Sequence, residues 1–458
     1  MNARYSVLPE RLRLRIPSGV REPIHIPALD GFRGLAIILV LLAHLRDLTG
    51  SYANDPMLYR LFFYGNIGVD MFFVLSGFLI TRALLVTRNK EHYLRNFYTR
   101  RALRIMPIYY AFLFFCLVLI PILWGPAVAD HLCGRPFDRM WLWIYGTNIV
   151  LAIKNAQVMQ ALNPLWSLAV EEQFYLVWPF LILMVRDSKL LARICVYLAV
   201  AAPIFRVIVI LSGSTLGSYT LTPCRIDGLA LGALIAVLEQ QANYKRTEMR
   251  LPPLMVVSSV VLLGVIAHFN FQGSLFYSGV GVTAALLLVA TIKFSQLKRF
   301  FESGCLRFFG RYSYGIYLYH LFVFYLVKEH AQALLHLTHI RALDLFIFDV
   351  VCTTAAVCVA FLSYHLFEKQ FLKLKDVLTA KPATDHTDDS GDEEKPESKR
   401  RKRIHIKTTT VDIKPLIGPL TQEQIANGTP VVGHDGQNVV SRQVSVFPVM
   451  SLSAPAGR

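Results

Sequence analysis

The sequence predicts an all-α integral membrane protein with about ten transmembrane helices in one bundle. Of its 458 residues, 54% are hydrophobic and 17% are charged, and the mean hydropathy is +0.44. A soluble domain carries about 25% charged residues. The apolar residues gather in runs of about 17–23 residues, the length that crosses a hydrocarbon core about 30 Å thick.

The apolar runs give the candidate spans in order. They are 31–49, 64–86, 103–124, 166–185, 190–212, 225–241, 252–270, 275–293, 312–330 and 343–366. The shorter run 141–153 has the length of a re-entrant or interfacial segment. Leaving it out places most Lys and Arg residues of the connections on the side of the N-terminus, as the positive-inside rule requires. The sequence thus predicts about ten spans with both termini in the cytoplasm.

Three regions differ in composition. Residues 1–24 form a basic cytoplasmic tail, residues 25–370 the membrane domain, and residues 371–458 a polar cytoplasmic tail that we expect to be mostly disordered. The last of these contains a basic run, 399–403, which either is a solvated block or contacts anionic lipid headgroups.

Two classes of function are disfavoured. The net charge of +16 would suit a nucleic-acid-binding protein. Much of the basic excess, however, flanks apolar runs and sets membrane orientation instead. No CxxC or His/Cys spacing indicates a metal site. A disulfide between Cys133 and Cys224, which both fall in predicted outer connections, is a weaker hypothesis.

Ionisable side chains inside the predicted spans are the strongest functional signal, because a charge in the membrane is costly. Arg33 and His44 lie 11 residues apart in the first span. This spacing puts both on one helical face, about 16 Å apart in depth. Asp70, Glu171 and Glu172 enter their own spans from the outside at about the depth of His44.

These groups predict a layer of titratable side chains in the outer leaflet. A neutral imidazole can take a proton from an attacking hydroxyl, and a nearby carboxylate can orient it. The alternative is that His44 is a buried histidine whose ring bonds a backbone carbonyl. The matched depth of three independent spans favours the catalytic interpretation.

Other polar residues have two readings each. Arg101 and Arg104 lie on one helical face and suit phosphate groups, or serve only as positive-inside charge. Arg225 and Asp227 lie on the predicted substrate path near the outer surface, or form a structural ion pair. His320, near mid-membrane, is either on the substrate path or structural. Gly228 and Gly232 form a small-xxx-small pattern that predicts close helix packing.

Six segments in this order resemble the membrane acyltransferase-3 family of bacterial O-acyltransferases, over about residues 25–370. They are LDGFRGLAIILVLLAHL, GVDMFFVLSGFLIT, RRALRIMPIYY, LWSLAVEEQFYLVWP, RIDGLALGALIA and SYGIYLYHLF. The resemblance implies that His44 is catalytic, that Arg33, Arg101 and Arg104 meet an acyl-coenzyme A donor, and that Glu171 and Glu172 form the family's acidic pair. Many members carry a fused esterase-like domain, which we do not find in this sequence.

The resemblance therefore implies an enzyme of the bacterial inner membrane. It would move an acyl group, by family default acetyl, from acetyl-CoA to a hydroxyl of an envelope carbohydrate, with His44 as general base and Asp70 and Glu171 or Glu172 tuning it. Its partners would be acyl-CoA, the carbohydrate and membrane lipids, with no permanently bound cofactor. The alternatives are a transporter or flippase for a glycan or lipid-linked sugar, and an acyltransferase for a small molecule.

Overall fold

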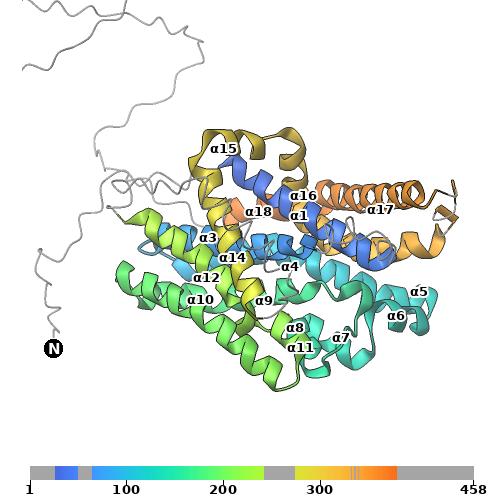
Figure 1. Cartoon of the computed structure of the whole chain (residues 1–458), viewed down its shortest axis with the longest axis horizontal. Helices are drawn as coiled ribbons and strands as arrows, with labels where there is room; N and C mark the ends of the chain where they lie inside the picture. Colours follow the sequence, from blue (N-terminus) through green and yellow to red (C-terminus); the bar gives the residue numbers. More distant parts are fainter. Residues whose placement is uncertain are drawn as a thin grey trace, which may run out of the picture. The chain divides into compact units, whose positions relative to one another are not determined.

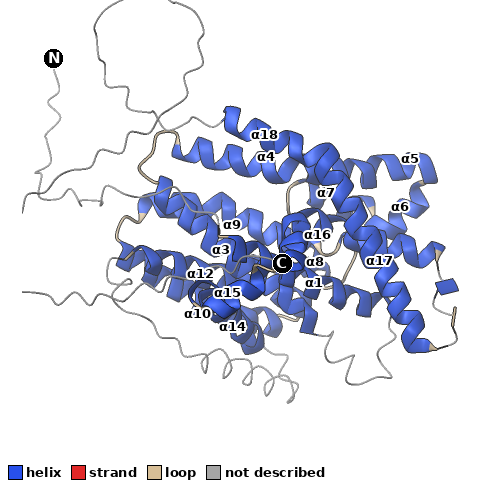
Figure 2. Ribbon diagram, turned by 90° about the horizontal axis from the view of Figure 1, so that it is seen from above, coloured by secondary structure: helices blue, strands red, loops and turns tan. Residues whose placement is uncertain are grey.

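The computed structural model describes residues 26–49, 64–241, 274–331, 333–334, 337–338 and 340–378. These residues form α-helices with short 3-10 and π turns, and none of them lies in a strand (Figure 2). The predicted span 252–270, the N-terminal tail 1–24 and the tail beyond residue 378 lie outside the described residues. Residues 371–378, which we assigned to the polar tail, instead belong to a helix, Lys369–Leu378.

The first half of the chain contains the long helices α1, α3 and α4, then a set of short helices, and then the long helix α9 (Figure 1). The elements are α1 (Pro27–Thr49), η3 (Tyr64–Asn66), α3 (Ile67–Thr87), α4 (Tyr93–Phe114), η4 (Phe115–Leu119), α5 (Ile120–Trp124), α6 (Pro126–Cys133), α7 (Pro136–Trp143), α8 (Thr147–Lys154), η5 (Gln160–Leu162) and α9 (Leu165–Met184).

The second half is dominated by long helices. They are α10 (Ser188–Leu211), α11 (Thr215–Thr220), α12 (Thr222–Gln240), α14 (Ser274–Lys293), α15 (Ser295–Phe301), α16 (Gly304–His330), α17 (Arg341–Ser363), η8 (Tyr364–Glu368) and α18 (Lys369–Leu378). Helix α18 packs beside α4, and α16 beside α17 and α1 (Figures 1 and 2).

Eight segments in the described ranges are long and apolar enough to cross a membrane, which agrees with an all-α membrane protein. They are Pro27–Leu48, Ile67–Thr87, Tyr93–Trp124, Leu165–Met184, Ser188–Leu211, Thr215–Gln240, Leu275–Lys293 and Ala342–Leu374. Each matches a predicted span. The predicted span 312–330 lies within the 27-residue helix α16, whose tyrosine, histidine and serine residues lower its hydropathy.

The ambiguous run 141–153 does not span. It falls in α7 and α8, which have eight residues each and are separated by a break around Tyr145 and Gly146. Eight helical residues reach only about 12 Å, less than half of a hydrocarbon core. The sequence prediction of a non-spanning segment is therefore confirmed.

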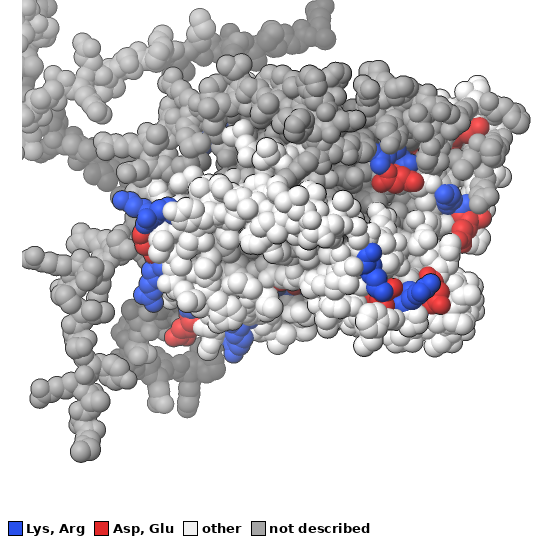
Figure 3. Space-filling model, turned by 60° about the horizontal axis from the view of Figure 1, so that its bottom comes forward, with Lys and Arg blue, Asp and Glu red and all other residues white. Residues whose placement is uncertain are grey.

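The charged side chains on the surface are distributed as in a membrane protein. On the face drawn in Figure 3, the Lys, Arg, Asp and Glu residues gather toward two opposite ends, and a broad band without charges lies between them. Long apolar side chains cover much of the outward surface of α10, where Tyr197, Val200 and Ile208 are more than half exposed. Such a surface suits lipid tails.

Glycines let the central helices touch backbone to backbone. A Cβ atom on Gly232 of α12 would overlap the carbonyl oxygen of Val74 on α3, and one on Gly34 of α1 would overlap that of Leu306 on α16. Gly228 faces the same helix as Gly232. The predicted close packing at Gly228 and Gly232 is confirmed, and it brings α12 against α3.

Candidate active site

Two pockets lie among helices α1, α3, α9 and α16. The first, which we call the arginine pocket, has a volume of about 100 Å³. It is lined by Arg33, Val69, Phe72, Phe73, Ser76, Arg101, Arg104, Ile105, Ser167, Leu168, Glu171, Tyr175, Ser313, Tyr314 and Tyr317.

The second, the histidine pocket, has a volume of about 210 Å³. It is lined by His44, Asp47, Leu48, Asn66, Val69, Leu151, Gln157, Gln160, Asn163, Pro164, Trp166, Leu216, Tyr219, Thr220, Tyr317, Leu321 and Tyr325.

The two pockets follow one another along the helix axes. On α1 the arginine pocket takes Arg33 and the histidine pocket takes His44, three turns later. On α9 the order is reversed, with Trp166 in the histidine pocket and Glu171 in the arginine pocket. Helices α1 and α9 therefore run in opposite directions, and the two pockets are stacked along them through the bundle.

His44 lines the histidine pocket, and one of its two ring nitrogens contacts the backbone. Its Nδ1 lies 2.9 Å from the carbonyl oxygen of Val40. Because a carbonyl oxygen only accepts hydrogen bonds, the neutral ring carries its proton on Nδ1 and keeps a lone pair on Nε2. The backbone contact that we considered as a structural alternative thus sets the tautomer that a general base needs.

The expected carboxylate partners do not lie beside His44. Glu171 lines the arginine pocket, where Ser76 and Tyr175 donate hydrogen bonds to its two oxygens at 2.8 Å and 3.0 Å. Asp70 pairs instead with Arg225 at 2.7 Å. Glu172 lines neither pocket. The acidic side chain that does line the histidine pocket is Asp47, three residues after His44.

The three arginines singled out from the sequence do converge. Arg33 from α1 and Arg101 and Arg104 from α4 line one pocket. The guanidinium of Arg101 lies over the Tyr175 ring at 5.5 Å, and Arg33 lies 3.5 Å from Asp30. Three cations and the single acidic residue Glu171 give this pocket an excess of positive charge, which suits phosphate groups.

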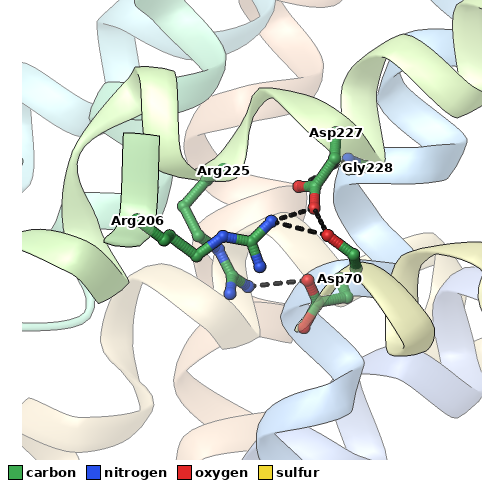
Figure 4. A network of polar contacts seen from close by, with 6 residues as sticks. Asp70, Arg206, Arg225, Asp227 and Gly228 are labelled. Atoms are coloured by element: carbon green, nitrogen blue, oxygen red, sulfur yellow. Dashed lines mark hydrogen bonds and ion pairs between the residues drawn. The ribbon is translucent and has the colours of Figure 1, made fainter. Parts of the chain in front are cut away.

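Arg225 and Asp227, in the first two turns of α12, are buried inside the bundle, with exposed fractions of 1% and 3%. Figure 4 shows their network: Arg225 binds Asp70, while Asp227 binds Arg206 and accepts a hydrogen bond from Ser278 at 2.9 Å. Aromatic rings surround Arg225, with Tyr277 at 4.7 Å. The geometry favours the structural reading of this pair, because both charges are buried and compensated.

His320 lies against His44, with the two ring centroids 4.8 Å apart. It is 1% exposed, and its Nδ1 lies 2.7 Å from the carbonyl oxygen of Tyr317. It lines neither pocket, and its link to the histidine pocket is its contact with His44.

Sequence reasoning missed several residues of this region. Arg206 sits in the apolar run of α10, and the rule applied to other buried charges identifies it. Ser76, Ser167 and Tyr317 carry no comparable signal, because hydroxyl groups are common in membrane helices.

Cys133 and Cys224 are both free thiols, so the hypothesised disulfide is absent. The Sγ atom of Cys133 faces the carbonyl oxygen of Cys116 at 3.8 Å. Within the part of the chain that the structure describes, no cluster of three or more His, Cys, Asp or Glu residues forms a metal site.

Comparison with known proteins gives consistent matches. A family model, Acyl_transf_3, described as an acyltransferase domain, matches residues 26–365. The chain is 31% identical to the peptidoglycan O-acetyltransferase OatA of Listeria monocytogenes over 326 residues, which is 65% of this chain and 49% of the relative. It is 26% identical to the O-acetyltransferase OatA of Staphylococcus aureus over 322 residues, 65% of this chain and 50% of the relative.

The chain thus spans about half the length of these curated relatives. No solved structure matches it.

Proposed function

Since the chain belongs to the acyltransferase-3 family, we propose that it transfers an acetyl group from acetyl-CoA to a hydroxyl group of a cell-envelope carbohydrate. The observation that carries this proposal is the stacking of an arginine-lined pocket against a pocket that holds His44 with its Nε2 unprotonated. One pocket suits a phosphorylated donor, and the other suits activation of a hydroxyl group.

The donor occupies the arginine pocket from the cytoplasmic side. Arg33, Arg101 and Arg104 bind phosphate oxygens of coenzyme A, because guanidinium groups pair with phosphate through charge-assisted hydrogen bonds. Ser167 and Tyr317 also line this pocket, and Tyr317 lines the histidine pocket as well. The thioester end of the donor points toward Tyr317.

The acceptor enters the histidine pocket from the outside. Four amide side chains line it, namely Asn66, Gln157, Gln160 and Asn163. Amides donate to and accept from sugar hydroxyl groups. Aromatic rings such as Trp166 and Tyr219 give apolar faces on which a sugar ring packs. The relatives from Listeria and Staphylococcus are named as O-acetyltransferases, one of them for peptidoglycan, which supports an envelope glycan as acceptor.

The reaction needs one base. The Nε2 atom of His44 takes the proton of the acceptor hydroxyl as its oxygen attacks the thioester carbonyl carbon. The carbon–sulfur bond breaks, and the coenzyme A sulfur leaves with the electron pair and receives the proton from the imidazolium. The products are the O-acetyl ester and coenzyme A.

The test is transfer of radiolabelled acetyl from acetyl-CoA to envelope material by membranes that contain the protein. We expect His44→Ala to lower transfer by about 100- to 10,000-fold, the contribution of a positioned general base. His330→Ala is a matched control, because Nδ1 of His330 contacts the Leu326 carbonyl at the same 2.9 Å while its ring lies exposed.

Wild-type activity in His44→Ala would contradict the assignment of the base. No transfer by the wild type, together with movement of a glycan or lipid-linked sugar across the membrane, would favour the transporter alternative. Transfer to a soluble small molecule but to no glycan would favour the small-molecule acyltransferase.

A further inference from the structure

Two side chains, Val69 of α3 and Tyr317 of α16, line both pockets. The remaining lining residues belong to one pocket or the other. We call the boundary formed by Val69 and Tyr317 the neck. It lies where the arginine pocket ends and the histidine pocket begins.

The ring of Tyr317 is held in place at the neck. Its hydroxyl group lies 2.6 Å from the carbonyl oxygen of Pro164 and 2.5 Å from the Oγ atom of Ser167. Because the carbonyl only accepts, Tyr317 donates to Pro164 and accepts from Ser167. Phe72 packs against the ring, with centroids 6.3 Å apart. Two hydrogen bonds and an aromatic contact thus keep the ring between the pockets.

The neck also lies next to the catalytic base. The Tyr317 and His320 ring centroids are 5.6 Å apart, and those of His320 and His44 are 4.8 Å apart. His320 donates from Nδ1 to the Tyr317 carbonyl oxygen at 2.7 Å. The residue that separates the pockets and the base that serves the reaction are therefore linked through one buried imidazole.

We propose that the neck selects the acyl group by size, so that Val69 and Tyr317 restrict transfer to acetyl. This inference rests on the proposed function. The arginines hold one reactant in the first pocket, and His44 activates the other in the second. Whichever reactant crosses, the new ester bond forms where the pockets meet, and the acyl substituent lies between the Val69 side chain and the Tyr317 ring.

The neck leaves little free volume for an acyl chain. Val69 is 4% exposed, and the Tyr317 ring is fixed by its two hydrogen bonds. A longer acyl chain adds methylene groups that need the volume these side chains fill, and close-packed surroundings yield little. One methylene group changes the specificity of a pocket by about 10- to 200-fold.

The experiment compares kcat/KM for butyryl-CoA with kcat/KM for acetyl-CoA in membranes that contain each variant. We expect Val69→Ala to raise the butyryl-to-acetyl ratio about tenfold or more over the wild type. Leu168→Ala and Leu321→Ala are the matched controls, since they enlarge only the arginine pocket and only the histidine pocket. Both should keep the wild-type ratio.

Tyr317→Phe is a second variant, which keeps the ring and removes both hydrogen bonds of the hydroxyl. It should also raise the ratio, because the ring is then free to move away from Val69. An unchanged ratio in Val69→Ala and Tyr317→Phe, or an equal rise in the two leucine controls, would overturn the inference. A wild type that transfers no acyl group from any CoA thioester would overturn the proposed function instead.

Discussion

Three arginines from two helices converge on one pocket, although Arg33 precedes Arg101 by 68 residues in the chain. Arg33 belongs to α1, whereas Arg101 and Arg104 lie one turn apart on α4. Ordinary positive-inside charge has no reason to gather around a pocket, because it acts from the connections at the membrane surface. Their convergence is what favours a phosphate-binding role.

Removing one of these cations should weaken donor binding. We expect Arg101→Ala and Arg104→Ala each to raise KM for acetyl-CoA about tenfold or more, because a hydrogen bond to a charged group is worth about 1.5–3 kcal/mol. S-acetylpantetheine, which lacks the phosphates, should show no such difference. Steady-state kinetics with both donors provides the measurement.

Arg100→Ala is the control, because Arg100 precedes the pair on α4, is exposed and does not line the pocket. An equal loss with acetyl-CoA and with S-acetylpantetheine would show that the arginines support the fold and not the phosphates.

The candidate residues differ in how well the sequence predicted them. Spacing placed Arg101 and Arg104 on one helical face, and only the family resemblance implied that Arg33 would join them. The structure does not place Asp70 and Glu171 beside His44, as the sequence had predicted. The reason is that a position along a span gives depth in the membrane but not the direction in which the side chain points. Asp70 turns toward Arg225, and Glu171 turns toward Ser76.

Among the elements, four helices are joined by a buried polar network. Asp70 of α3 pairs with Arg225 of α12, and Arg206 of α10 and Ser278 of α14 bind Asp227, also of α12 (Figure 4). The network lies beside the glycine contact between α3 and α12. It therefore fixes the helix that carries the neck residue Val69.

Breaking the buried pair should destabilise the protein. Asp70→Asn leaves the guanidinium of Arg225 without its counter-charge, a loss of about 3–5 kcal/mol for a buried ion pair. We expect a clear drop in the thermal unfolding midpoint of the detergent-solubilised protein. Asp130→Asn removes the partner of Arg139 in a pair whose carboxylate is 47% exposed. That exposed pair contributes about 0–1 kcal/mol.

The opposite pattern is informative. If Asp70→Asn unfolds at the wild-type midpoint but loses acetyl transfer, then Asp70 acts in the chemistry, as the sequence first indicated, and the structural interpretation is wrong.

At the scale of the whole molecule, hydropathy and charge predicted the class of fold and most spans, because a lipid environment demands long apolar helices. The stacking of two pockets through the bundle was not predictable. It depends on which faces of α1, α3, α9 and α16 meet, and apolar membrane helices pack through small residues and shape instead of a one-sided apolar stripe. Gly34 and Gly232 show this dependence directly.

The predicted orientation is testable by thiol labelling. In a cysteine-free variant, Lys154→Cys at the end of α8 should react with a membrane-impermeant maleimide in intact cells, since α8 lies in a predicted outer connection. Lys189→Cys at the start of α10 should react only after the membrane is opened. Both lysines are exposed in the structure. The reverse labelling pattern would invert the predicted topology and place the arginine pocket outside.

The central claim, that a cytoplasmic donor and an outer acceptor meet at His44, is tested most directly by a sided transfer assay. Radiolabelled acetyl-CoA, which does not cross membranes, is added outside sealed vesicles in either orientation. We predict that inverted vesicles, whose cytoplasmic face is outward, acetylate envelope glycan in their lumen, and that right-side-out vesicles do not. His44→Ala vesicles should do neither. Labelling by right-side-out vesicles, or by the His44 variant, would contradict the account.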